Sequence, residues 1–442
     1  MTTPSSVSPL VRIARATSVV MSLFILSRGL GLVREMIIGA RFGAGAELDA
    51  YLAAFRLPDL LFTLVAGGAL ASAFIPTFGE RLAHGRTAAA WDLAAKVATL
   101  LLVTLTLLAL LAALLARPLV AYLIAPGFSP AQQRLTAELL RWMLVSTVLF
   151  GLSGLVMGIL QSFQRFLLPA LAPVVYNLAI ILAAWLLAPV LGIRGLVVGV
   201  VGGALGHLLV QIPGLRRVGA RGRPSLSLTD PGVREVLRLM GPRVLGLAVV
   251  QLNFLVNVFL ASHLPAGSIS ALNYAWLLML LPQGVLAQSV ATAAFPTFAR
   301  QAALGERAAM RTTLKGILGL LLAVSVPAAL LLFWLREPLV VLLFRRGAFD
   351  AAAVALTGYA LAFFAPGLIG HVVVEIVARA FYALKDTLTP VLVGVAAMTL
   401  NIALSLLLIR PLAHGGLALA NSLATLAEMG VLLLFLRRRL AD

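Results

Sequence analysis

Apolar stretches of about 20 residues or more recur along the whole chain. A stretch of that length crosses the hydrocarbon core of a bilayer as an α-helix. The composition agrees: 61% of the 442 residues are hydrophobic and only 11% are charged, whereas a soluble protein has about a quarter of its residues charged. The sequence therefore predicts an all-α, polytopic membrane protein and excludes a soluble multidomain protein.

The apolar stretches predict twelve membrane-spanning helices, which cover residues 18–40, 48–75, 91–116, 138–161, 168–190, 194–213, 234–261, 267–295, 312–335, 353–381, 388–409 and 416–436. Basic residues favour one side of these spans by about two to one, which places both termini in the cytoplasm by the positive-inside rule. The net charge of +18 is thus explained mainly by cytoplasmic loops, and no nucleic acid is needed as a partner.

The two halves of the chain resemble each other at a shift of about 220 residues. Residues 73–78 (AFIPTF) match residues 293–298 (AAFPTF), and further matches in register run through to the C-terminus. Each half holds an even number of predicted spans, so both halves enter the membrane from the same side and form a parallel repeat. We therefore expect two six-helix lobes around a central cavity, residues 1–212 and 234–442, joined by a basic cytoplasmic linker at 213–233.

Charged residues inside the apolar stretches concentrate in the first two predicted spans. Each costs about 2.5–3.5 kcal/mol on insertion scales, so such residues usually face a cavity or a partner. Arg28 lies within the first span, whereas Arg34 and Glu35 lie nearer its outer end, where snorkelling to the interface is the alternative. The second span contains Asp49, Arg56 and Asp59. Arg56 and Asp59, three residues apart, are expected to pair on one helix face.

Five residues are candidates for gating or coupling. Pro58 is expected to kink or break the second span, a feature of transporters that also occurs in helices without a function. His371 and Glu375 are four residues apart and share a helix face, where they form either a proton relay or a plain structural hydrogen bond. The candidates are Pro58, Asp59, His371, Glu375 and Glu428.

A cavity of net positive charge favours an anion, and the planar fork of Arg suits phosphate. The residues alone therefore indicate an alternating-access transporter for an anionic, phosphorylated substrate. The chain has no Cys, its five His are scattered, and it contains no nucleotide-binding or hydrolase motif, so we expect no metal site, no cofactor and no enzyme activity. A structural scaffold is the alternative, which duplicated lobes with charges inside the membrane disfavour.

Several motifs stand out: residues 27–35 (SRGLGLVRE), 49–61 (DAYLAAFRLPDLL), 125–128 (APGF) and 272–275 (LNYA). They resemble the MurJ/MviN family of lipid II flippases. The resemblance implies the multidrug/oligosaccharidyl-lipid/polysaccharide exporter fold and export of lipid II, the undecaprenyl-pyrophosphate-linked peptidoglycan precursor, across the bacterial inner membrane. It also implies a substrate site of Arg28, Arg34, Asp49 and Arg56 in which arginines hold the pyrophosphate.

The same resemblance implies that a membrane potential or an ion gradient supplies the energy. The implied partners are lipid II or a related prenyl-pyrophosphate glycan, membrane lipids and cell-wall synthesis proteins.

The chain departs from the family pattern at four positions. Phe62 and Thr63 stand where members have basic residues, Gly67 where they have an acidic one and Leu277 where they have Arg. The sequence also ends without the last two spans that many members carry. These departures leave open a different prenyl-linked glycan as substrate. A drug/cation antiporter of the same superfamily, supported by Glu375 and Glu428, is a further alternative, whereas short external loops disfavour a membrane-embedded glycosyltransferase.

Overall fold

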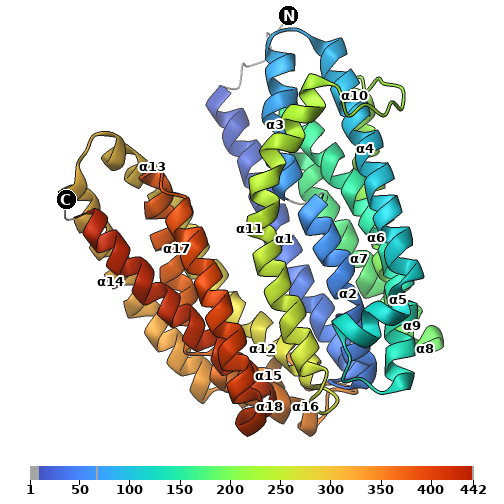
Figure 1. The fold of residues 1–442 in the computed structure, drawn as a ribbon, viewed down its shortest axis with the longest axis vertical. Helices are drawn as coiled ribbons and strands as arrows, with labels where there is room; N and C mark the ends of the chain where they lie inside the picture. The colour runs from blue at the N-terminus through green and yellow to red at the C-terminus, as the bar shows by residue number, and fades with distance from the viewer. Residues whose placement is uncertain (1–8, 66–67, 441–442) are drawn as a thin grey trace, which may run out of the picture. The chain divides into compact units, whose positions relative to one another are not determined.

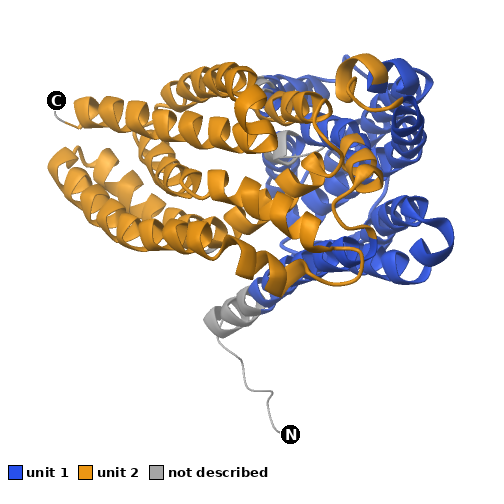
Figure 2. Cartoon of the chain, turned by 90° about the horizontal axis from the view of Figure 1, so that it is seen from below, with its two compact units in different colours: residues 1–41, 54–120, 130–248 blue, residues 42–53, 121–129, 249–442 orange. Residues whose placement is uncertain are grey.

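The structure is a computed structural model, and it describes residues 9–65 and 68–440. The described residues form helices and no strand. They divide into two compact units, which are coloured separately in Figure 2. The first contains residues 1–41, 54–120 and 130–248, and the second contains residues 42–53, 121–129 and 249–442. The predicted lobes at 1–212 and 234–442 and the linker at 213–233 stay a prediction.

The helices of the N-terminal half are α1 (Pro9–Phe42), α2 (Ala46–Val65), α3 (Gly68–Ala83), α4 (Thr87–Leu114), α5 (Ala116–Leu119), the π-helical turn η1 (Val120–Ile124), α6 (Pro130–Ser162), α7 (Leu167–Leu186), α8 (Ala188–Leu191), α9 (Ile193–Leu209) and α10 (Ile212–Arg217). Within the first unit, α6 packs against α3, α4 and α9, and α7 packs against α9. Figure 1 shows α4, α6, α7 and α9 running side by side.

The helices of the C-terminal half are α11 (Pro231–Ala261), α12 (Ser268–Gln283), the π-helical turn η2 (Gly284–Gln288), α13 (Ser289–Ala303), α14 (Arg307–Trp334), α15 (Arg336–Phe344), α16 (Ala351–Phe364), α17 (Gly367–Ala383) and α18 (Leu388–Arg439). Within the second unit, α17 packs against α13, α14 and α18, and α16 packs against α12 and α18. The helices α2 and α11 contribute residues to both units.

Each of the twelve predicted spans overlaps one or more helices of the described residues. The spans at 388–409 and 416–436 both lie in α18, and six spans overlap two or more helices, among them 48–75 and 353–381. The span at 353–381 breaks where Pro366 and Gly367 interrupt the apolar run, and α16 and α17 meet there at a bend of 48°. Among the described residues, seven helices are long and apolar enough to cross a membrane, or eight if α16 and α17 count as one span. The number twelve therefore stays a prediction.

The internal repeat is visible in the backbone. The helices α4 and α14 each have 28 residues and begin 220 positions apart, at Thr87 and Arg307. The turns that precede them contain Gly85 and Gly305, with φ of 70° and 69°. Further along, Gln164 and Lys385 share φ values of 56° and 60° at a shift of 221. This agreement at positions with positive φ shows that the backbone follows the same path in the two halves.

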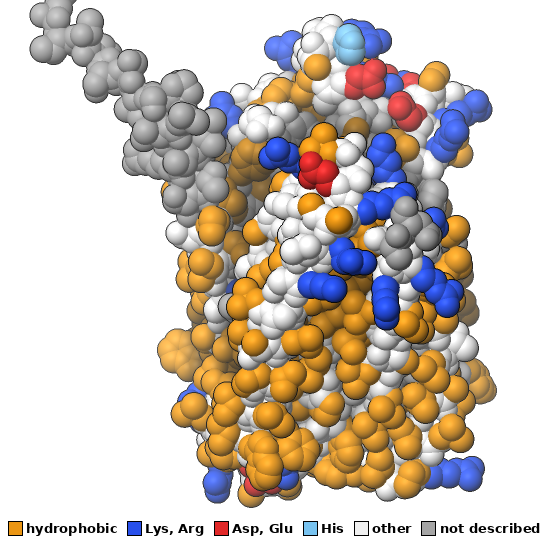
Figure 3. Space-filling view, turned by 90° about the vertical axis from the view of Figure 1, so that its left-hand side faces the viewer, with side chains coloured by type: hydrophobic (Ala, Val, Ile, Leu, Met, Phe, Trp, Pro, Cys, Tyr) orange, Lys and Arg blue, Asp and Glu red, His pale blue; other side chains and the backbone are white. Residues whose placement is uncertain are grey.

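The surfaces of the two halves repeat as well. Leu110 and Leu111 of α4 are more than half exposed, as are Leu330 and Leu331 of α14. Large apolar side chains that face outward along a helix are stable in lipid and not in water. On the face drawn in Figure 3, basic side chains gather in the upper half and hydrophobic side chains cover the lower half. This separation is expected of a protein with an apolar belt and a basic membrane edge.

Two positions that are equivalent in the repeat share an unusual backbone conformation, which is strained at only one of them. Gly192, between α8 and α9, has φ 58° and ψ −142°. Its counterpart 221 residues later is Ala413, with φ 47° and ψ −129°, where α18 departs from helical geometry. This region of backbone space suits Gly, and another residue there costs about 1–3 kcal/mol.

We therefore expect Ala413→Gly to stabilise the protein by about 1 kcal/mol, because the relief of strain exceeds the added entropy of the unfolded chain. Gly192→Ala should destabilise it by a similar amount, although a Cβ at Gly192 would meet no atom within 4 Å. Thermal unfolding of the purified variants in detergent measures both changes. Destabilisation by both substitutions would show that side-chain contacts, and not backbone strain, determine the stability change at these two positions.

Candidate functional site

The charged residues of α1 form a network with α7 in the first unit. The Arg34 guanidinium donates to Glu35 Oε1 at 2.6 Å and 3.1 Å and to Asn177 Oδ1 at 3.0 Å. The Asn177 amide in turn donates to the Ser27 carbonyl at 3.2 Å. Arg34 and Glu35 form an ion pair and are both partly buried. Asn177 therefore binds α1 at two positions, Ser27 and Arg34. The network supplies hydrogen-bond partners for the Arg34 guanidinium within an apolar helix.

Arg28 has a different environment on the same helix. It is exposed, and its guanidinium carbon lies 5.2 Å from the centre of the Phe24 ring. Among the described residues, no carboxylate binds it. Six residues separate Arg28 from Arg34, which corresponds to about 9 Å along a helix axis.

The other charged pair of the predicted site lies on α2. Arg56 is partly buried and interacts electrostatically with Asp59, as the spacing of three residues predicted. Asp59 also acts on Tyr176 of α7, as do Arg34 and Glu35. The first unit therefore brings Arg34, Glu35 and Asp59 near Tyr176 of α7.

Pro58 does not end the second helix. It is buried inside α2, which continues to Val65. The Thr147 hydroxyl donates to the Pro58 carbonyl at 3.4 Å, so α6 supports the backbone near the proline. A break at Pro58 is thus absent, whereas a kink there stays a prediction.

Asp49 is grouped with the second unit, whereas Arg28, Arg34 and Arg56 belong to the first. Its carboxylate is 2% exposed and accepts three hydrogen bonds, from Gly267 N–H at 2.6 Å, Ser270 N–H at 2.7 Å and the Ser270 hydroxyl at 2.6 Å. The donors lie at the first turn of α12, where backbone N–H groups lack helical partners and favour negative charge. In this structure Asp49 caps α12, and its substrate-binding role stays a prediction.

The candidates for coupling lie in the second unit. The ring of His371 contacts Asn421 Oδ1 at 3.2 Å and lies edge-on to Trp276 at 5.3 Å. Glu375 instead accepts from Arg379 at 2.8 Å, in an ion pair within α17. Each member of the predicted His371–Glu375 pair thus binds another partner. Glu428 is partly buried in α18, where its Oε1 would lie 3.6 Å from a Cβ at Gly394.

Three of the positions that depart from the family pattern are described. Phe62 packs against Phe150 at a ring distance of 5.6 Å, and Thr63 and Leu277 are partly buried. Gly67 lies outside the described residues.

Asn177 is the residue of the network that the sequence analysis missed. It is a single amide in the apolar run of α7, 143 residues from Arg34 in sequence. A lone amide in a membrane span was the available signal, because such a group needs a partner inside the protein. Among the described residues, no three His, Cys, Asp or Glu side chains are grouped so that they could hold a metal ion.

The cap on α12 yields a prediction. We expect Asp49→Asn to destabilise the protein by about 2 kcal/mol, because the amide replaces one acceptor by a donor and removes the charge that faces three donors. Ser270→Ala removes one of the three hydrogen bonds and should cost about half as much. Thermal unfolding in detergent measures both variants. Equal unfolding temperatures for the wild type and Asp49→Asn would contradict this assignment.

Comparison with known proteins identifies the family. The family described as lipid II flippase MurJ matches residues 38–441. The lipid II flippase MurJ of Burkholderia cenocepacia is 33% identical over 437 residues, which cover 96% of this chain and 84% of that protein. The probable lipid II flippase MurJ of Vibrio cholerae is 32% identical over 437 residues, which cover 95% of this chain and 82% of that protein.

Solved structures share the fold. The lipid II flippase MurJ in its inward closed conformation aligns with a TM-score of 0.82 at 25% identity, covering 95% of this chain and 87% of that chain. An inward-facing transporter of the multidrug resistance MATE family aligns with a TM-score of 0.78 at 14% identity, covering 95% of this chain and 94% of that chain. These likenesses confirm the predicted all-α membrane fold.

The family is one of transporters in the bacterial inner membrane, so the expectations of a multi-pass transporter and of no enzyme activity are confirmed. The family model covers most of the chain, and its relatives are matched over most of their length. The chain therefore belongs to the MurJ family of lipid II flippases.

Proposed function

We propose that this chain moves lipid II from the inner to the outer leaflet by alternating access. Membership of the MurJ family and the similarity to a solved MurJ structure support this substrate. The repeated backbone supports the mechanism, because two equivalent halves allow a membrane protein to rock around a site between repeats. Both termini lie in the cytoplasm in this proposal, in keeping with the bias of basic residues.

The arginines of α1 bind the pyrophosphate. The observation that carries this assignment is the contrast between Arg28 and Arg34. Arg34 is bound by Glu35 and Asn177, whereas Arg28 contacts the Phe24 ring and is exposed. A guanidinium that already binds a carboxylate gains less binding free energy from a phosphate than a guanidinium without a carboxylate partner. Arg28 is therefore the main pyrophosphate ligand, and Arg34 adds charge from a fixed position.

Arg56 supplies the third positive charge of the site and Asp59 holds it in place. Asp49 contributes by fixing the first turn of α12.

A membrane potential or an ion gradient drives the cycle, and no cofactor takes part. His371, Glu375 and Glu428 are the coupling candidates, because an ionisable group inside a membrane span usually lies on an ion path or a proton path. Membrane lipids and cell-wall synthesis proteins are the further partners.

A different prenyl-linked glycan is the second candidate substrate. It is favoured by the uncharged Phe62, Thr63 and Leu277, which leave fewer charges for the headgroup than the family pattern provides.

The assignment predicts the behaviour of Arg28 variants. Arg28→Ala should bind lipid II about 10- to 100-fold more weakly, since a hydrogen bond to a charged group contributes about 1.5–3 kcal/mol. It should also fail to restore growth of a bacterium depleted of its own flippase. Arg28→Lys should restore part of the activity, because the charge remains while the two-pronged contact is lost.

Arg307→Ala is the matched control, because Arg307 is an exposed arginine at the start of α14. Immunoblots of the membrane fraction verify that all variants insert equally. Full growth with Arg28→Ala at normal membrane levels would contradict the role of Arg28.

A further inference from the structure

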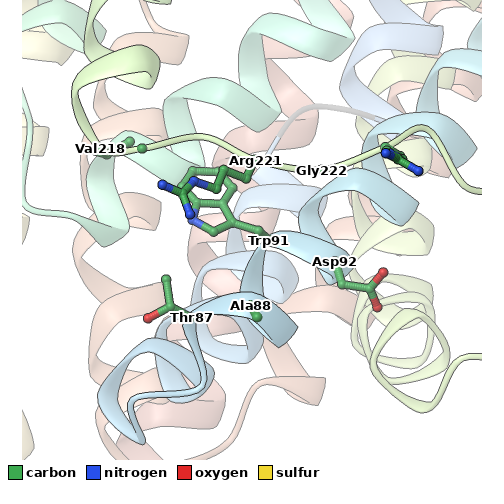
Figure 4. Close-up of a pocket in the computed structure, with 9 residues that line it drawn as sticks. Thr87, Ala88, Trp91, Asp92, Val218, Arg221 and Gly222 are labelled. Carbon is green, nitrogen blue, oxygen red and sulfur yellow. The ribbon is translucent and has the colours of Figure 1, made fainter.

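A pocket of about 510 Å³ lies in the first unit, between the N-terminal end of α4 and the segment that follows α10. Thr87, Ala88 and Trp91 line it from α4, and Arg221 and Arg223 line it from residues 218–223. Figure 4 shows Arg221 projecting from that segment toward Trp91. The volume is within the range of small-molecule sites and exceeds what a bare phosphate ion needs.

Residues 218–230 form one side of the pocket, and three contacts hold this segment against α4. Gly222 has φ 156°, and a Cβ there would lie 2.9 Å from the Ala95 side chain. Further along, the Ser225 N–H donates to the Thr99 hydroxyl at 3.2 Å. Lys96 donates to Asp230 at 2.8 Å, and this hydrogen bond lowers the pKa of the Asp230 carboxyl. The pocket is thus bounded by a segment that packs along the helix.

The charges around the pocket favour an anion. Arg221 and Arg223 are both exposed, and no carboxylate binds either of them among the described residues. Asp92, which also lines the pocket, is bound by Lys96 at 2.6 Å. The first turn of α4 contains no acidic residue, and no side chain caps it. Two arginines therefore line a pocket that also includes a helix end, and both features favour negative charge.

The surroundings of the pocket are those of a membrane interface. Trp91 is 6% exposed and stacks on Phe163 at a ring distance of 5.8 Å. Tryptophan is enriched at membrane–water interfaces because its ring is apolar and its N–H is polar. Downstream of the arginines, Leu226 and Leu228 are 57% and 56% exposed. Basic residues followed by outward-facing leucines are typical of a segment that lies in the headgroup region.

We propose that this pocket binds the phosphodiester headgroup of an anionic phospholipid. Arg221 and Arg223 bind the phosphate oxygens, Trp91 forms the floor beneath the headgroup, and Leu226 and Leu228 contact the adjoining acyl chains. The bound lipid holds residues 218–230 against α4. This site is separate from the pyrophosphate site on α1, and it does not depend on the proposed transport of lipid II.

Native mass spectrometry of the full-length protein in detergent tests the site, with phosphatidylglycerol and phosphatidylcholine as probes. The variant Arg221→Gln/Arg223→Gln should bind phosphatidylglycerol about 10- to 30-fold more weakly, because each basic residue near anionic lipid contributes about 1 kcal/mol. Phosphatidylcholine binding should not change. Ala88→Trp should weaken phosphatidylglycerol binding as well, since it fills the pocket from an exposed position of α4 without removing a charge.

The matched control is Arg216→Gln/Arg217→Gln, which removes the same charge from exposed arginines just before the pocket. We expect it to change phosphatidylglycerol affinity by about twofold or less. Equal losses in the two double variants would overturn the proposal in favour of general attraction by the basic segment. Unchanged binding in Ala88→Trp would also overturn it. Displacement of phosphatidylglycerol by millimolar inorganic phosphate would assign the pocket to a soluble anion and refute the lipid.

Discussion

A polar group inside a membrane has no water to bind, so the protein itself must supply its partner. This constraint determines where the polar side chains of this chain lie. Arg34 is bound by Glu35 and Asn177, and the Ser153 hydroxyl contacts His207 at 2.7 Å and Gln211 at 2.7 Å. All of these contacts except Arg34–Glu35 join segments that are far apart in sequence. These polar residues thus connect the helices of the first unit, and apolar side chains face outward.

The same constraint separates residues that stabilise the fold from residues that are available to a substrate. Asp49 accepts three hydrogen bonds at the first turn of α12 and is buried, so its carboxylate serves the structure in this state. Arg28 has no such partner and remains exposed. An exposed guanidinium within a membrane helix is costly unless a ligand or water-filled cavity faces it. That cost is the physical argument for placing the pyrophosphate at Arg28.

Much of this arrangement could be predicted from the sequence. The length of the apolar stretches predicted an all-α membrane fold, and the repeat of 220 residues predicted the matching helices α4 and α14. The contacts between distant residues could not be predicted, because one sequence does not show that Asn177 faces Arg34 or that Asp49 meets Ser270. The continuation of α2 through Pro58 has a local reason: a helix loses one hydrogen bond at proline, and a neighbouring helix can compensate for that loss. The strain at Ala413 was hidden as well, since alanine favours helix and only its counterpart Gly192 indicates the break.

The central claim is that this chain moves lipid II between leaflets, and a leaflet-accessibility assay in proteoliposomes tests it most directly. Lipid II would be placed in one leaflet, and its appearance in the other would be followed with and without a membrane potential. The account predicts that transfer increases in proportion to the amount of protein, responds to the potential and exceeds that of a phosphatidylcholine probe. Transfer at the rate of protein-free liposomes under both conditions would contradict the claim.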